Sequence, residues 1–133
     1  MLIKNLFNCY FLFLKMYLCN ISFTRLSIFF NNFIIMAIIT LTSDWGVSDF
    51  YVPAVKGAIY SALPNVNIVD ITHNVTPFDV KSAAFIVKNC YKNFPKGTIH
   101  ILAVDTEEAT ENPHVGLKVD EHYCVGTDNT IFS

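Results

Sequence analysis

The sequence predicts an α/β domain built on a parallel sheet with flanking helices, incomplete at its carboxyl end. Short apolar runs alternate with amphipathic runs of helical period, which is the pattern of parallel strands joined by crossover helices. Each apolar run also leads to a polar or acidic residue: Asp44, Thr72 with His73, and Asp105. Because parallel strands end at one edge of a sheet, these residues should lie together where α/β proteins bind ligands.

The first strand and helix are expected between residues 38 and 63. Residues 38–41 are apolar, and residues 43–46 read Ser-Asp-Trp-Gly, as in a tight turn. The amphipathic run 50–63 then predicts a helix. Asp44 thus follows a strand, where its carboxylate is suited to accept hydrogen bonds from a ribose diol, although Asp is also common as a helix cap.

The second strand is expected at residues 68–73, with a second helix after it. Thr76 is the expected N-cap, Pro77 suits the first helical position, and Asp79 lies where the helix dipole favours an anion. Apolar residues then recur along one helical face, namely Ala83, Ile86, Val87, Cys90, Tyr91 and Phe94. The Pro-Lys-Gly sequence at 95–97 is expected to end this helix.

The third strand is expected at residues 98–104, which are nearly continuous in apolar residues, as in a strand buried on both faces. Residues 115–119 and 123–125 should then pair as a hairpin that turns at 120–122. The histidines lie on separate elements without the spacing of metal ligands, so no metal site is predicted. We expect His73 to hydrogen-bond backbone at the rim of the sheet.

Several short motifs follow one another in a fixed order along residues 36–133. They are Thr42-Ser43-Asp44-Trp45-Gly46, Lys56-Gly57, residues 68–73, Pro77-Phe78-Asp79, residues 94–100, Val104-Asp105 and Asp128-Asn129. In this order and spacing they resemble the N-terminal part of the S-adenosylmethionine (SAM) hydroxide adenosyltransferases, which are relatives of the fluorinase and chlorinase enzymes. No single motif is specific for this family, but the full set in this order and spacing is.

The resemblance implies an enzyme that binds SAM as its substrate, without a cofactor, and delivers water or hydroxide to the ribose C5′. Adenosine forms and methionine leaves. By position, Asp44 would accept from the ribose hydroxyls, Asp49 would lie near the methionine ammonium, and Phe78 would pack beside the adenosyl group. Asp105 would hold the attacking water. The fluorinase has no acidic residue there, so a SAM-dependent halogenase is the less favoured interpretation. The family also implies a homotrimer for the full-length protein.

Purely structural roles remain open for the same residues. Asp44 would then cap the first helix, Asp49 would only interact favourably with the helix dipole, and Phe78 would anchor the core. The sequence also departs from the family, because Asn112 stands at the position of an arginine and Asp128-Asn129 is followed by Thr130 instead of Gly. Glu107, Glu108 and Glu111 replace a glycine-rich turn.

The family continues past its Asp-Asn motif with a histidine and a β-rich C-terminal domain. We therefore expect this chain to be a partial N-terminal domain that is inactive by itself. The alternative is a nucleoside-binding α/β module or remnant without catalysis.

Residues 1–35 form an apolar extension of different character from the rest. They contain no acidic residue, and Lys15 interrupts the best apolar window. We interpret them as a mis-assigned start, with Met36 as the true one; a membrane anchor and a signal peptide are the alternatives.

Without residues 1–35, the composition is that of a soluble, mildly acidic domain at 36–133. No basic patch indicates nucleic-acid binding, and no paired cysteines require an oxidising compartment. The expected location is cytoplasmic, or membrane-anchored if residues 1–35 are genuine.

Overall fold

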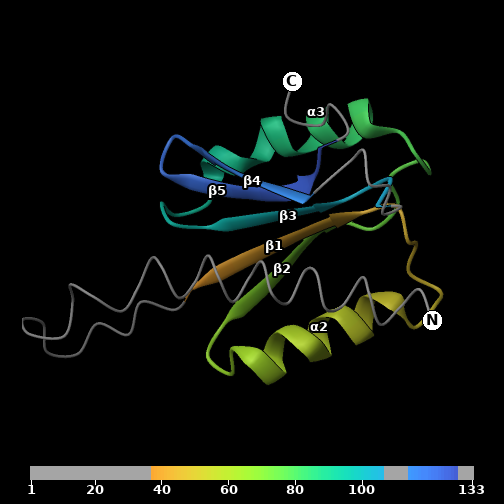
Figure 1. Ribbon diagram of the computed structural model, residues 1–133, viewed down its shortest axis with the longest axis horizontal. Coiled ribbons are helices and arrows are strands. Elements are labelled where there is room, and N and C mark those ends of the chain that lie inside the picture. The colour runs from red at the N-terminus through yellow and green to blue at the C-terminus, as the bar shows by residue number, and fades with distance from the viewer. Residues whose placement is uncertain (1–36, 107–113, 129–133) are drawn as a thin grey trace, which may run out of the picture. The chain divides into compact units, whose positions relative to one another are not determined.

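The computed structural model describes residues 37–106 and 114–128, and these residues fold as a sheet flanked by helices (Figure 1). The elements are β1 (Ile38–Ser43), α2 (Tyr51–Ala62), β2 (Asn67–Thr72), α3 (Val80–Cys90), the 3₁₀ turn η1 (Tyr91–Asn93), β3 (Ile99–Ala103), β4 (His114–Val119) and β5 (His122–Thr127). The predictions concerning residues 1–35 and Met36 lie outside the described residues.

The strand order is β2-β1-β3-β5-β4. β1 pairs in parallel with both β2 and β3, and β3 pairs in parallel with β5. β4 joins β5 as an antiparallel edge strand. The predicted α/β class and parallel sheet are therefore confirmed. Because β1, β2 and β3 run the same way, the residues that follow them meet at one edge of the sheet, which we call the carboxyl rim.

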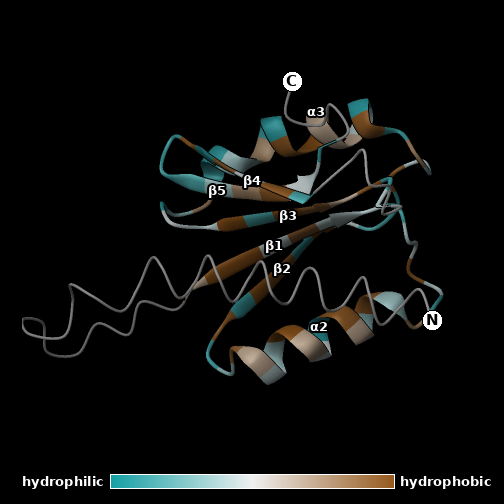
Figure 2. Ribbon diagram, viewed as in Figure 1, coloured by the Kyte–Doolittle hydropathy of each residue, from teal (hydrophilic) through white to brown (hydrophobic). Residues whose placement is uncertain are grey.

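The core follows from the apolar runs of the central strands. Every residue of β3 is buried, as are all but the first of β1, whereas the edge strand β2 is partly exposed. Figure 2 shows the hydrophobic colour concentrated on β1 and β3, and α2 and α3 lie on opposite sides of the sheet (Figure 1). On the α3 side, helix and sheet share one apolar cluster: Val75, Ala83, Val87, Leu102, Val104 and Cys124.

The hairpin between β4 and β5 turns where the sequence predicted it. Asp120 and Glu121 both have positive φ, at 49° and 66°. A two-residue hairpin turn of the type that matches strand twist requires left-handed backbone at both central positions. The turn lies at the amino end of β5, away from the carboxyl rim.

The start of α3 differs from the prediction. The N-cap is Asp79, whose Oδ1 accepts from the backbone N–H of Ser82 at 3.0 Å. Thr76 and Pro77 instead belong to a turn in which the Thr76 carbonyl accepts from Asp79 N at 2.9 Å. The predicted cap at Thr76 and first helical position at Pro77 were wrong because Phe78 has a φ of 64°, which no right-handed helix admits.

The other helix boundaries are closer to the prediction. α2 begins one residue after the expected start, at Tyr51. The α-helical part of α3 ends at Cys90, and η1 carries the chain on toward Pro95. In the part of the chain that the structure describes, neither helix has the length and apolar character needed to cross a bilayer.

Candidate functional site

Three of the four predicted site residues meet at the carboxyl rim. Oδ2 of Asp44 accepts a hydrogen bond from the backbone N–H of Phe78 at 3.1 Å and a longer one from that of Asp105 at 3.4 Å. Asp44 follows β1, Phe78 lies in the loop after β2, and Asp105 follows β3. The loops after three neighbouring parallel strands therefore converge on one carboxylate oxygen.

The two amide donors come from residues with unusual backbone geometry. Phe78 has a φ of 64° and Asp105 a φ of 53°. The left-handed region costs an L-residue roughly 1–2 kcal/mol. Asp enters it more readily than most residues, whereas a bulky residue such as Phe is a genuine outlier there. Strained residues of this kind cluster at ligand-binding and active sites.

The Phe78 side chain is not a core anchor, because it is 65% exposed. Val47 and Phe50, in the loop between β1 and α2, are also exposed large hydrophobic residues. The rim thus offers an aromatic face close to the backbone that contacts the Asp44 carboxylate. Such a combination suits a ligand with a flat apolar part and hydroxyl donors.

Asp49 makes a different contact from the other three residues. Its Oδ1 accepts from the backbone N–H of Phe50 at 2.6 Å, one residue before α2, and it is exposed. The position is compatible with either of its sequence-based interpretations, a contact to a ligand cation or an interaction with the helix dipole.

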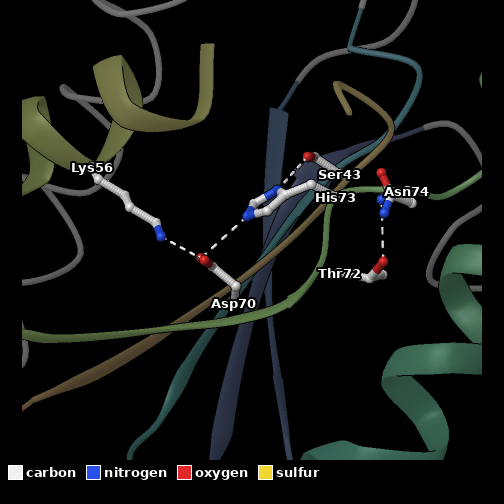
Figure 3. A network of polar contacts seen from close by, with 6 residues as sticks. All are labelled: Ser43, Lys56, Asp70, Thr72, His73 and Asn74. Carbon is white, nitrogen blue, oxygen red and sulfur yellow. Dashed lines mark hydrogen bonds and ion pairs between the residues drawn. The ribbon is translucent and has the colours of Figure 1, made fainter. Parts of the chain in front are cut away.

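A polar network, buried at Ser43 and His73 and exposed at Asp70, supports the loop that carries Asp44 (Figure 3). Ser43 Oγ lies 2.7 Å from Nδ1 of His73, and His73 Nε2 contacts Asp70 Oδ1 at 3.1 Å without hydrogen-bond alignment. Lys56 on α2 donates to the other oxygen of Asp70. The network therefore joins α2, β2 and the end of β1. Ser43 is 1% exposed, so this Ser–His–Asp order cannot present a nucleophile to a substrate.

The charge of Asp70 holds this network together at neutral pH. Partial burial raises the pKa of the Asp70 carboxyl, but the hydrogen bond from Lys56 and the close contacts with Lys56 and His73 outweigh it and leave the pKa below its ordinary 3.8. The carboxylate is therefore ionised at neutral pH and available to both partners.

The prediction that His73 hydrogen-bonds backbone holds for its carbonyl group but not for its ring. Its backbone carbonyl accepts from Gly46 N at 2.7 Å, in a turn where Gly46 has a φ of 74°. Its ring, however, contacts the Ser43 hydroxyl and not backbone. The available signal was Asp70, a charged residue inside an apolar strand, three positions before His73.

A second histidine cluster lies far from the rim. His100 Nδ1 is 2.7 Å from Thr40 Oγ1, and His100 Nε2 is 3.3 Å from His122 Nδ1. Burial, with a smaller contribution from His122, lowers the pKa of His100 from 6.5 to about 4. These residues lie toward the amino ends of β3 and β5 and take no part in the rim. In the described part of the chain, no three His, Cys, Asp or Glu side chains gather as metal ligands would.

Some of the sequence departures fall outside the described residues. These are the acidic residues Glu107, Glu108 and Glu111, together with Asn112, Asn129 and Thr130. Their predicted consequences therefore remain predictions.

Comparison with known proteins identifies the family of the chain. Residues 39–133 match the SAM hydroxide adenosyltransferase N-terminal domain. The chain is 33% identical over 104 residues to the (R)-S-adenosyl-L-methionine hydrolase of Methanocaldococcus jannaschii, covering 74% of this chain and 39% of that protein. It is also 33% identical over 84 residues to a fluorinase of an Actinoplanes species, covering 63% of this chain and 28% of that protein.

Solved structures share the fold as well as the sequence. A crystal structure of an uncharacterised conserved protein from Thermotoga maritima matches with a TM-score of 0.66 at 33% identity, over 71% of this chain and 36% of that one. A conserved hypothetical protein from Thermus thermophilus matches with a TM-score of 0.64 at 30% identity, over 73% of this chain and 40% of that one. The chain thus spans about two-fifths or less of the length of these relatives. It belongs to the SAM hydroxide adenosyltransferase family and matches the N-terminal domain of that family.

Proposed function

We propose that this chain is the adenosyl-binding part of a SAM hydrolase that forms adenosine and methionine. The convergence of Phe78 and Asp105 on the Asp44 carboxylate is the observation that carries the proposal. It brings an exposed aromatic ring, an acceptor for a diol and a second carboxylate to one edge of the sheet. Relatives named SAM hydrolases are about one-third identical to the chain, which supports the same substrate.

Each residue then has a distinct role. A carboxylate offers about four acceptor sites, so the two amides on Oδ2 of Asp44 leave Oδ1 for the ribose hydroxyls. The exposed Phe78 ring packs against the adenosyl group. Asp105 accepts a hydrogen bond from the attacking water and so orients it. Asp49, which is exposed just before α2, is assigned to the methionine ammonium.

The reaction is a displacement at the ribose C5′. A water or hydroxide oxygen forms a bond to C5′ while the bond from C5′ to the sulfonium sulfur breaks, and its electron pair leaves with methionine. When water attacks, its proton passes to solvent or to a base. Since an anionic nucleophile and a sulfonium cation lose their charges together, a preorganised and water-poor site favours the step.

Catalysis needs more than the described rim provides. The residue at the family's arginine position is the neutral Asn112, and catalytic groups of this kind contribute about 10²–10⁴-fold each. We therefore expect the 133-residue chain to bind SAM and to hydrolyse it slowly or not at all. The alternative is a nucleoside-binding module without catalysis. It predicts that the chain binds SAM through the same surface and forms no product at all.

The test is chromatographic. The purified chain is incubated with SAM, and adenosine and methionine are measured together, with Asp105→Asn as the comparison. We expect binding, with at most slow release of both products that Asp105→Asn abolishes. Robust turnover lost in Asp105→Asn would show a complete site within this chain. Halide-dependent formation of a 5′-halogenated adenosine would contradict the preference for water.

We further propose a cytoplasmic location, from the composition of residues 36–133, and a homotrimer for the full-length protein, as the family resemblance implies. SAM is the only small-molecule partner proposed, and no cofactor is. Residues 36–133 are proposed as the partial N-terminal domain, with residues 1–35 outside it. Size-exclusion chromatography with light scattering on the full-length protein would test the trimer.

A further inference from the structure

We propose that Asp44, besides binding the ribose, is the positioning residue of the rim: its Oδ2 clamps the backbone amides of Phe78 and Asp105 and holds both residues in left-handed backbone. The inference rests on the proposed function for the identity of the ligand, but the clamp itself is a property of the unliganded chain. It assigns separate tasks to the two carboxylate oxygens of one side chain.

The clamp joins loops that are far apart along the chain. Phe78 lies 34 residues after Asp44, and Asp105 lies 61 residues after it. Both N–H groups nevertheless point at the same oxygen. A carboxylate that accepts from backbone amides of two other loops fixes those loops relative to its own, because charge-assisted hydrogen bonds are stronger than neutral ones.

The clamp also coincides with the residues of unusual backbone conformation. Among the described residues, four that are not glycine have positive φ: Phe78, Asp105, Asp120 and Glu121. The last two are explained by the two-residue hairpin turn between β4 and β5. The remaining two are the ones that donate to Asp44. One carboxylate therefore accounts for both unexplained left-handed residues.

The clamp also sets the positions of the Phe78 ring, the start of α3 and the Asp105 carboxylate. Phe78 is followed directly by Asp79, the N-cap of α3, and its carbonyl accepts from Val80 N at 3.0 Å. Holding Phe78 thus sets both the exposed aromatic ring and the start of the helix. Holding Asp105 sets the carboxylate proposed to orient water. The side chains proposed to contact the ligand are thus preorganised through their backbone.

Two substitutions separate the clamp from the diol contact. Asp44→Asn keeps a side-chain carbonyl oxygen that can accept from both amides, but it replaces the other acceptor oxygen with an NH₂ group and removes the charge. Asp44→Ala removes the clamp and the diol acceptor together. Asp120→Asn serves as the matched control, because Asp120 is a carboxylate at the opposite end of the sheet that bonds Tyr91 and Lys92.

The experiment measures hydrogen exchange of the Phe78 and Asp105 amides by nuclear magnetic resonance and, in parallel, the affinity for adenosine by calorimetry. We expect protection of both amides in the wild type, in Asp44→Asn and in Asp120→Asn. We expect at least tenfold faster exchange in Asp44→Ala. Adenosine affinity should fall at least tenfold in both Asp44 variants and stay unchanged in Asp120→Asn.

The outcomes keep the two proposals apart. Unchanged exchange of both amides in a folded Asp44→Ala protein overturns the clamp, whatever the affinity does. Unchanged adenosine affinity in both Asp44 variants overturns the proposed function while the exchange data still decide the clamp. If Asp44→Ala does not fold, a scalar coupling across the hydrogen bond from Phe78 ¹⁵N to Asp44 ¹³Cγ in the wild type decides instead, and its absence overturns the clamp.

Discussion

Phe78 combines an exposed ring with a backbone conformation that phenylalanine rarely adopts. Its side chain is 65% exposed, so burial in the core does not explain why an apolar ring is kept there. Its amide is held by Asp44, so the ring's position is set by the rim. We therefore expect Phe78 to contribute more to ligand binding than to the stability of the fold.

We predict that Phe78→Ala weakens adenosine binding about fivefold, since aromatic packing contributes about 1 kcal/mol beyond area burial. The free energy of unfolding should change by less than about 0.5 kcal/mol, as for an ordinary surface position. Calorimetry and urea unfolding give the two quantities. The matched control is Phe85→Ala, which removes a ring that is 68% exposed on α3, away from the rim. Equal affinity loss in both variants would contradict a specific role for Phe78.

His100 makes stability depend on pH. Its pKa is about 4 in the folded chain and near 6.5 when unfolded, because it is fully buried beside His122 and Thr40. Between those values the unfolded state binds a proton that the folded state does not. The free energy of unfolding therefore falls as the pH falls from about 6.5 toward about 4.

The slope from this one group reaches at most about 1.4 kcal/mol per pH unit. The other titratable groups near His100, besides His122, are Tyr91 and the exposed Lys92 and Asp120. Asp120 pairs with both Tyr91 and Lys92. We predict that urea unfolding at pH 7 and pH 5 shows a drop in stability that is smaller in His100→Gln. The same drop in both proteins would assign the pH dependence to other groups.

At the scale of elements, α3 depends on a cap that the sequence did not single out. Asp79→Ala removes the hydrogen bond to Ser82 N and should lower the free energy of unfolding by about 1 kcal/mol. Asp79→Asn, which keeps an acceptor oxygen, should lower it less. Thr76→Ala at the predicted cap should have little effect, because Thr76 precedes the helix. Thermal or urea unfolding of the three variants checks this; a larger loss in Thr76→Ala would restore the original prediction.

β1, β2 and β3 were predictable because each contains a mainly apolar run. They lie within about two residues of their predicted bounds, and the β4–β5 hairpin turns within the predicted segment 120–122. The start of α3 was not predictable, because Thr76 and Asp79 are both good capping residues. The choice between them depends on Phe78, whose amide is taken by a carboxylate 34 residues earlier in the chain.

The candidate site was predictable to the same extent. The rule that parallel strands end at one edge placed Asp44 and Asp105 together, and the family resemblance added Phe78. The contact between the Ser43 hydroxyl and the buried His73 ring was not foreseen. Ser43 and His73 lie 30 residues apart, and no local pattern states which buried polar groups pair across strands.

For the molecule as a whole, the described residues bring the ends of the parallel strands β1, β2 and β3 to one edge of the sheet. The chain matches the N-terminal domain of its family and covers 39% of the length of the hydrolase from M. jannaschii. The residues proposed to contact the adenosyl group, Asp44 and Phe78, lie within the described residues. Binding of SAM and its hydrolysis are therefore measured separately in this protein.

The most direct test of the account is a calorimetric titration of SAM into the 133-residue chain and into Asp44→Ala. Loss of a hydrogen bond to a charged group costs about 1.5–3 kcal/mol, or roughly tenfold to a hundredfold in affinity. We predict measurable binding to the wild type and a reduction of that size in the variant, with methionine alone not competing for the adenosyl site. Equal SAM affinity in both proteins would contradict the placement of the ribose at Asp44 and, with it, the central claim.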